Sequence, residues 1–308
     1  MKILVTGGAG FIGSHVAEAF LGAGHKVAVL DDLSMGRKEN VPPGAEFVEL
    51  DIRNPRIGEL FRENRFDVVI HHAAQMDVRK SVEDPSNDAD VNILGTLNLL
   101  QNCVAHGVGR FIFASTGGAI YGEQEAFPAT EDHPTRPVSP YGVSKLSVEK
   151  YLHYYRVVNG LEYTVLRYAN VYGPRQNPHG EAGVVAIFVS KMLEGSKPVI
   201  NGDGGQTRDY VFVGDVVAAN LLAPGVKGSG VFNIGTGIET SVNDIFRGLR
   251  ALTGSDTPEV HGPAKKGEQT RSVIDSSLAR RVMGWTPAVS LADGLGRTVD
   301  YFRNAAGR

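Results

Sequence analysis

A tyrosine and a lysine near the middle of the chain are spaced for proton-transfer chemistry. Tyr141 and Lys145 lie four residues apart, directly after Ser139 and Pro140, which suit the first turn of a helix. On a helix this spacing places both side chains on the same face, one turn apart. A lysine cation beside a phenol favours the phenolate, and a second cation nearby would favour it further. The pair therefore predicts a tyrosine general base that works near neutral pH.

Two hydroxyl-bearing residues precede this helix in the chain. An apolar run over residues 110–115 predicts a strand, and Ser115 and Thr116 stand at its carboxyl end. At that edge of a sheet, one of the two hydroxyls could share a hydrogen bond with the substrate hydroxyl that Tyr141 deprotonates. The alternative is that both residues cap a turn.

A glycine-rich turn at the start of the chain predicts a dinucleotide site. Gly7, Gly10 and Gly13 follow an apolar run and open a helix, one residue wider than the pattern Gly-x-Gly-x-x-Gly. Glycines let the chain turn sharply and a phosphate approach closely, and free N–H groups at a helix start attract negative charge. Asp31 ends the next apolar run, where an acid can hold ribose hydroxyls and disfavours a 2′-phosphate. We therefore expect NAD; the alternative is a glycine-rich turn without a cofactor.

Composition excludes several classes of function. The net charge of −3 argues against nucleic acid as the main partner. No run approaches the roughly 18 apolar residues of a membrane span, and the first residues do not resemble a signal peptide, so we expect a cytoplasmic protein that does not enter a membrane. The single cysteine, Cys103, allows no intrachain disulfide, and the histidines lack the spacing of metal ligands. We expect no metal site.

Strand and helix patterns alternate through the first half of the chain. This order predicts an α/β fold, a doubly wound parallel sheet whose ligand lies beyond the carboxyl ends of the strands. The expected strands after the first cover residues 26–30, 46–50, 67–71, 110–115 and 163–168, and the expected helices cover 56–64, 88–106 and 142–159. After Pro174 the pattern changes to loops rich in Gly and Pro with short elements between them. We expect a cofactor domain of residues 1–173, to which 211–235 return, and a smaller C-terminal substrate domain of residues 174–210 and 236–308.

These residues resemble a known family, the extended short-chain dehydrogenase/reductases with a Rossmann domain, and among them the nucleotide-sugar epimerases and dehydratases. The resemblance covers nearly the whole chain, and bacterial UDP-glucose 4-epimerases are the most similar members. It is carried by motifs in the family's order: Thr-Gly-Gly-Ala-Gly-Phe-Ile-Gly-Ser-His at 6–15, Asp-Ile-Arg at 51–53, His-His-Ala-Ala-Gln at 71–75, the Tyr141/Lys145 pair, Arg-Tyr-Ala-Asn-Val-Tyr-Gly-Pro-Arg at 167–175, Gly-Asp-Gly-Gly-Gln-Thr-Arg at 202–208 and Gly-Trp-Thr-Pro at 284–287.

The resemblance implies an isomerase that interconverts UDP-glucose and UDP-galactose, as in galactose metabolism, through a 4-keto sugar with tightly bound NAD. Tyr141 would take the proton of the sugar 4-hydroxyl, and Lys145 would also hold the nicotinamide ribose. By similarity, the cofactor would contact Gly7, Gly10, Phe11, Ile12, Gly13, Asp31, Asp51, Ile52, Ala73, Ala74, Asn92, Tyr141 and Lys145. The substrate would contact Thr116, Tyr141, Asn170, Arg208, Lys265 and Ser272.

Two departures from the family pattern concern the substrate. The position at which the family usually carries a catalytic Ser or Thr is occupied by Gly117 in this chain. The hydroxyl of the preceding residue, Thr116, is therefore the candidate, and Ser115 is the second choice. Neither Gly117 nor Gly118 offers the acids that dehydratases and decarboxylases carry in this turn. The position that gates the sugar pocket falls on Ser272, whose small side chain leaves room for UDP-N-acetylglucosamine.

Further expectations and alternatives follow from the same resemblance. Helices 88–106 and 142–159 are apolar on more than one face, which fits a homodimer formed through them, although a buried helix would look the same. A UDP-glucuronate 4-epimerase would need a cation facing the sugar carboxylate, for which Arg79, Lys80 and Arg175 are available. An NAD-binding regulatory protein without catalysis is the alternative of another class.

Overall fold

The computed structural model describes residues 1–179, 183–264 and 269–306. A seven-stranded sheet forms the larger part, in the order β10-β6-β5-β4-β1-β2-β3, and all of its neighbouring strands are parallel. The strands are β1 (Lys2–Thr6), β2 (Lys26–Asp31), β3 (Glu46–Glu49), β4 (Val68–His71), β5 (Arg110–Thr116), β6 (Glu162–Tyr168) and β10 (Gly230–Ile234). The order reverses between β1 and β4, and ligands of such sheets bind outside the strand ends at this switch point.

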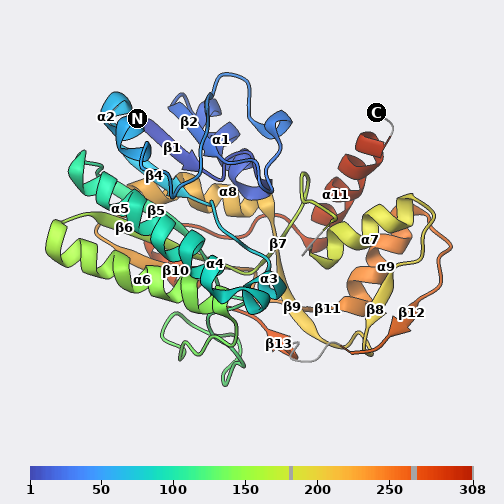
Figure 1. The fold of residues 1–308 in the computed structure, drawn as a ribbon. Helices are drawn as coiled ribbons and strands as arrows, with labels where there is room; N and C mark the ends of the chain where they lie inside the picture. The colour runs from blue at the N-terminus through green and yellow to red at the C-terminus, as the bar shows by residue number, and fades with distance from the viewer. Residues whose placement is uncertain (180–182, 265–268, 307–308) are drawn as a thin grey trace.

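Helices cover both faces of this sheet (Figure 1). One apolar core packs α1 (Phe11–Gly22), α8 (Val213–Leu222) and α10 (Ser277–Met283) against the strands. The opposite core packs α2 (Ile57–Asn64), α5 (Gly95–Ala105) and α6 (Pro140–Asn159). Burial on both faces explains why the central strands are nearly continuous apolar runs. The predicted doubly wound parallel sheet is confirmed.

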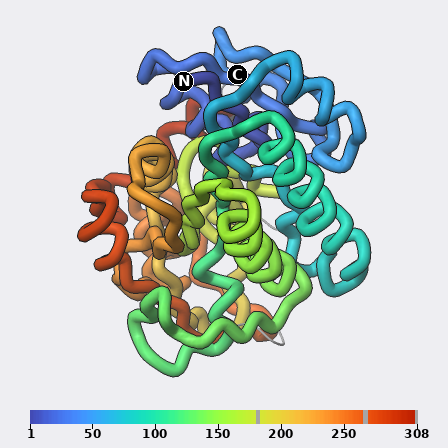
Figure 2. The backbone as a smooth tube through the Cα atoms, turned by 90° about the vertical axis from the view of Figure 1, so that its left-hand side faces the viewer, coloured from blue at the N-terminus to red at the C-terminus, as the bar shows by residue number. Residues whose placement is uncertain are grey.

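A smaller group of elements lies beside the carboxyl ends of the main sheet (Figures 1 and 2). Its sheet has the order β11-β9-β13, and β7 also pairs with β9. These strands are β7 (Asn170–Tyr172), β9 (Thr207–Phe212), β11 (Glu239–Ser241) and β13 (Arg271–Ser272). A core of their apolar residues packs with α7 (Val184–Leu193), α9 (Val242–Thr253) and α11 (Leu291–Ala306). Because β7 begins two residues after β6 ends, the smaller sheet starts directly at the edge of the main sheet.

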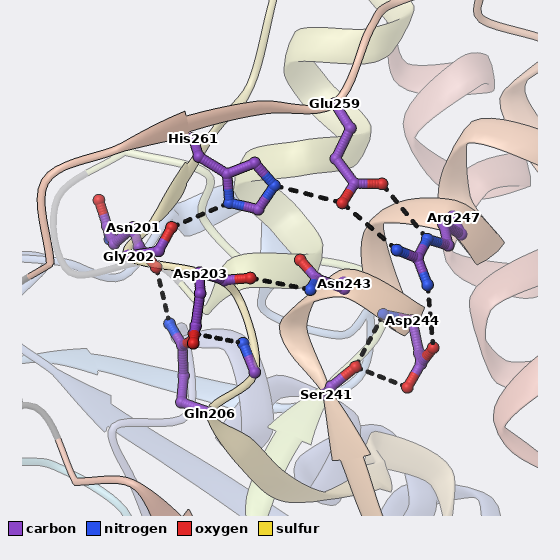
Figure 3. A network of polar contacts seen from close by, with 11 residues as sticks. Asn201, Gly202, Asp203, Gln206, Ser241, Asn243, Asp244, Arg247, Glu259 and His261 are labelled. Atoms are coloured by element: carbon purple, nitrogen blue, oxygen red, sulfur yellow. Dashed lines mark hydrogen bonds and ion pairs between the residues drawn. The ribbon is translucent and has the colours of Figure 1, made fainter.

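A separate pair of strands completes this part. β8 (Val199–Asn201) and β12 (Val260–Gly262) are parallel. The Asn243 side chain on α9 donates to the Asp203 carbonyl oxygen in the turn after β8 (Figure 3). Among the described residues, no helix has the length and apolar content needed to cross a membrane. The same residues contain no cluster of three potential metal ligands among His, Cys, Asp and Glu.

The expected helix at 88–106 is interrupted. Residues Asp90–Leu94 form a π-helical turn between α4 (Pro85–Ala89) and α5, and the short helix α3 (Val78–Glu83) was not predicted. A π turn widens the helix by one residue and is frequent at functional sites. Asn92 lies in this π turn and is only 3% exposed.

Candidate functional site

The glycine-rich turn can pack as closely as it does only because it lacks side chains. A Cβ atom on Gly13 would lie 2.2 Å from the carbonyl oxygen of Gly7, and Gly7 itself has a left-handed φ of 66°. Gly10 is the N-cap of α1, and no side chain caps that helix start. Free N–H groups at a bare helix N-terminus attract a phosphate. The turn therefore fits the pyrophosphate of a dinucleotide.

Asp31 ends β2 beside this turn. Its carboxylate accepts hydrogen bonds from the backbone N–H groups of Ala9 and Leu33, both at 2.9 Å. Burial raises the pKa of Asp31, and these two bonds partly oppose that effect. The carboxylate thus braces the glycine-rich turn and lies where sequence analysis expects ribose hydroxyls.

Other expected cofactor residues surround the switch point. Phe11 and Ile12, in the first turn of α1, pack against the core of the smaller part. The N–H of Ala73 donates to the Thr6 hydroxyl at 3.3 Å, and Ala73 and Ala74 are both half-buried after β4. The glycine turn and the loop after β4 therefore border the same space.

Asp51 and Ile52 follow β3 and differ in their surroundings. Asp51 forms a salt bridge with Arg53 at 2.5 Å, and the hydrogen bonds from Arg53 lower the pKa of Asp51. The Ile52 side chain is buried in the core, where it packs against α5 at Gly95. Only the backbone of Ile52 is therefore available to a cofactor.

Tyr141 and Lys145 lie in the first two turns of α6. Ser139 caps this helix through a hydrogen bond to the N–H of Gly142. The Lys145 Nζ atom lies 5.8 Å from the centre of the Tyr141 ring and 4.7 Å from that of Phe113. It donates to the carbonyl oxygen of Ala114 at 2.9 Å. The predicted stacking of lysine and phenol is present.

Burial sets the charge balance of Lys145. Its side chain is 4% exposed, and burial lowers its pKa to about 8, although the charges of Asp88 and Glu149 act in the opposite direction. Two neutral imidazoles complete the surroundings, because burial lowers the pKa of His72 to about 3 and that of His71 far below its usual value. With a pKa of about 8, Lys145 keeps its positive charge at neutral pH but loses it not far above.

The two candidate hydroxyls have different partners. The Ser115 Oγ donates to Glu149 at 2.6 Å inside the core. Thr116 is half-buried at the end of β5, and a Cβ atom on Gly118 would lie 3.8 Å from its Oγ1 and 3.2 Å from the Asn170 amide oxygen. Thr116 and Asn170 therefore border the same turn, whereas Ser115 is bonded to a helix behind it.

Strand register brings three expected substrate residues together. Asn170 of β7 is paired with Tyr210 of β9, and Ser272 of β13 is paired with Arg208 of β9. Arg208 and Tyr210 are two residues apart, so they point to the same face, as do residues paired across a ladder. Asn170, Arg208 and Ser272 therefore share one face of the smaller sheet. Lys265 lies outside the described residues.

Asn92 belongs to a buried network that sequence analysis missed. Its amide bonds to the backbone N–H and carbonyl of Gln75, both at 2.9 Å, and donates to Asp88 at 3.0 Å. Asp88 is fully buried and also accepts from Ser144 at 2.6 Å. Sequence analysis did not find Asp88, whose partners Ser144 and Gln75 come from other segments.

Glu149 is a second residue that sequence analysis missed. It forms a buried salt bridge with Arg167 at 2.6 Å, and Arg167 also donates to the Tyr121 hydroxyl at 2.9 Å. One signal was available: Glu149 lies one helical turn after Lys145, on the face that must pack against the sheet. An acid on that face requires a buried partner.

Comparisons with known proteins find relatives over nearly the whole chain. The family model described as "NAD dependent epimerase/dehydratase family" matches residues 3–235. The UDP-glucose 4-epimerase of Mycolicibacterium smegmatis is 46% identical over 99% of both chains. The crystal structure of Thermotoga maritima UDP-glucose 4-epimerase with UDP-glucose has a TM-score of 0.98 at 50% identity, covering 99% of this chain and 100% of that one. The Thermus thermophilus UDP-glucose 4-epimerase complex with NAD has a TM-score of 0.94 at 47% identity, with the same coverage.

Proposed function

Because this chain belongs to the NAD-dependent epimerase/dehydratase family, we propose that it is an NAD-dependent enzyme that interconverts UDP-glucose and UDP-galactose at C4. The observation that carries the proposal is the placement of the Lys145 ammonium over the Tyr141 ring, beside the strand end that bears Thr116. Bound NAD would supply a reversible acceptor for the hydrogen at C4, so that the reaction has no net redox change.

Each residue of the site has a role in this proposal. Tyr141 accepts the proton of the sugar 4-hydroxyl. It returns the proton after the sugar ring has turned over and presents its other face to the cofactor. Lys145 lowers the cost of the phenolate by its charge and is placed to hold the nicotinamide ribose. Thr116 shares a hydrogen bond with the sugar hydroxyl, and this bond strengthens as the oxygen becomes negative.

The smaller sheet would hold the nucleotide end of the substrate. Asn170 and Arg208 lie on the face that also carries Ser272. A guanidinium suits a diphosphate because it offers several donors in one plane. With the diphosphate fixed there, the sugar can turn over about its own linkage without leaving the site.

Proton NMR of the sugar tests this function directly. The purified protein is incubated with UDP-glucose without added cofactor, and the C4 stereochemistry of the product is followed. We expect UDP-galactose to form, and Tyr141→Phe to reduce the rate at least about 100-fold. If the wild-type protein binds NAD but converts no UDP-sugar, the regulatory alternative replaces the enzyme.

One cation considered for a glucuronate carboxylate is engaged elsewhere in the structure. Of the cations considered for a glucuronate carboxylate, Arg175 is bound by Glu18 at 2.7 Å and by Ser14 at 3.3 Å, both on α1. The Arg175 guanidinium is therefore held by α1. UDP-glucuronate serves as the comparison substrate in the same NMR assay, and we expect no turnover.

We further propose that the protein is a homodimer through α5 and α6. Large apolar side chains are exposed on α6, including Tyr154 at 51%, Val157 at 69% and Val158 at 59%. A two-fold axis between these helices would cover the same patch on both copies. Sedimentation should give twice the chain mass, and Tyr154→Glu should give the chain mass. A cytoplasmic location stays a prediction.

A further inference from the structure

The charges around Lys145 are unevenly paired. Two acidic side chains, Asp88 and Glu149, raise its pKa against the effect of burial. Glu149 already has a cation of its own, because Arg167 binds its two carboxylate oxygens through Nε at 3.1 Å and Nη2 at 2.6 Å. Its negative charge is therefore largely balanced before Lys145 is considered.

Asp88 has no such partner among the hydrogen bonds of the described residues. Its Oδ2 accepts from the Ser144 hydroxyl at 2.6 Å, and its Oδ1 accepts from the side-chain amides of Gln75 and Asn92, both at 3.0 Å. All three donors are neutral. Asp88 is fully buried, and neutral donors offset only part of the cost of burying a carboxylate, so a positive charge nearby would stabilise it further. Lys145 directly follows Ser144 on α6 and is itself buried, and the charge of Asp88 raises its pKa.

The same bonds fix where the lysine lies. Ser144 precedes Lys145 on α6, so its bond to Asp88 ties the first turns of that helix to α4. Asn92 links the carboxylate to the loop after β4 through Gln75. Asp88 thus touches the helix that carries Tyr141 and Lys145 without reaching the reacting atoms itself.

We propose that Asp88 is the counter-ion and positioning residue of Lys145, and that it holds the lysine in the charged form on which the Tyr141 base depends. The inference rests on the proposed function only for its kinetic consequence. The groups facing Lys145 are Asp88 from α4, Glu149 and Tyr141 from its own helix, and the neutral His71 and His72 from the β4 edge.

Asp88→Asn tests the charge while keeping the shape. Without the carboxylate, Lys145 should lose its proton at lower pH, by about one unit. The alkaline limb of the pH profile of kcat should move to lower pH by the same amount. The matched control is Asp90→Asn, which removes an acid two residues away that is exposed and paired with Arg53. It should leave the limb in place.

A second measurement does not depend on turnover or on bound cofactor. The chain is labelled with ¹³C at lysine Cε, and the resonance of Lys145 is assigned by its loss in Lys145→Met. Its titration should shift to lower pH in Asp88→Asn and stay unchanged in Asp90→Asn. If Asp88→Asn lowers kcat but moves neither the titration nor the limb, Asp88 is merely structural and the proposal fails.

A double variant covers the case in which Asp88→Asn does not fold. Removing one member of a buried charge pair leaves the other uncompensated, whereas removing both does not. Asp88→Asn should therefore destabilise the Lys145→Met protein less than the wild type in urea unfolding. An equal loss in both backgrounds would overturn the pairing. A wild type that does not epimerise would instead contradict the proposed function, and the lysine titration would still decide the inference.

Discussion

The Ser115 Oγ lies 2.6 Å from the Glu149 carboxylate, inside the core and behind the strand end. Glu149 in turn binds Arg167 through both of its oxygens. A hydroxyl in such a network is held by charged neighbours and cannot turn toward a sugar without leaving a carboxylate under-bonded. This relationship separates two neighbouring hydroxyls that sequence analysis left as alternatives.

We therefore predict opposite effects at these two positions. Thr116→Val should lower kcat about 10-fold to 100-fold and leave stability nearly unchanged, because it removes a bond made to the reacting oxygen. Ser115→Ala should retain most of the activity and cost about 1 kcal/mol of stability, since it removes one of the donors to the buried Glu149 carboxylate, which keeps its bonds from Arg167. Epimerisation rates and urea unfolding measure both. The reverse pattern would make Ser115 the catalytic hydroxyl.

The glycine turn gives a second prediction with a control in the same helix. Gly13→Ala would place a Cβ atom 2.2 Å from the Gly7 carbonyl oxygen, so the turn must shift, at a cost of about 1–3 kcal/mol. We expect the purified variant to retain little NAD, measured after acid release. Gly22→Ala, at the exposed end of α1, meets nothing within 4 Å and should keep both NAD and stability. Equal NAD content in the two variants would contradict the phosphate site.

Local patterns made much of this site predictable. The spacing of Tyr141 and Lys145 and the glycine turn lie within single segments, where helix geometry and missing side chains act directly. Asp88 could not be found in this way, because its partner Ser144 is 56 residues away in the chain. Asn92, which lies in the π turn, likewise bonds to Gln75, in a loop 17 residues earlier.

The smaller part shows the same limit. Asn170, Arg208 and Ser272 were expected near the substrate from the family resemblance, but their common face follows from the register of three strands. Periodicity cannot supply that register, since two of these strands are only two or three residues long.

Substrate breadth gives a third prediction. The family resemblance predicts that Ser272 gates the sugar pocket; in the structure this small residue is 4% exposed and paired with Arg208. We expect the wild type to convert UDP-N-acetylglucosamine as well as UDP-glucose. Ser272→Tyr should reduce kcat/KM for the N-acetyl sugar at least about 10-fold more than for glucose, whereas Ser272→Ala should keep the wild-type ratio. Equal losses for both sugars in Ser272→Tyr would show general damage rather than exclusion.

His261 lies between two acceptors at the turn shown in Figure 3. Its Nδ1 faces the Gly202 carbonyl oxygen at 2.9 Å, and its Nε2 faces the Glu259 carboxylate at 3.2 Å. A ring that donates from both nitrogens is the imidazolium. The bonds to Gly202 and Glu259 accordingly raise the pKa of His261, and the charge of Asp203 acts in the same direction.

The last prediction concerns how the β8–β12 pair responds to pH. Because the pKa of His261 is raised in the folded state, its protonation stabilises this pair; the contribution is complete below the unfolded pKa and is lost as pH rises through the folded value. Hydrogen exchange at residues 199–203, corrected for intrinsic rates, should therefore show less protection at pH 8.5 than at pH 5.5. His261→Ala should lose this pH dependence, and Glu259→Gln should weaken it. A wild-type response that persists in His261→Ala would assign it to another group.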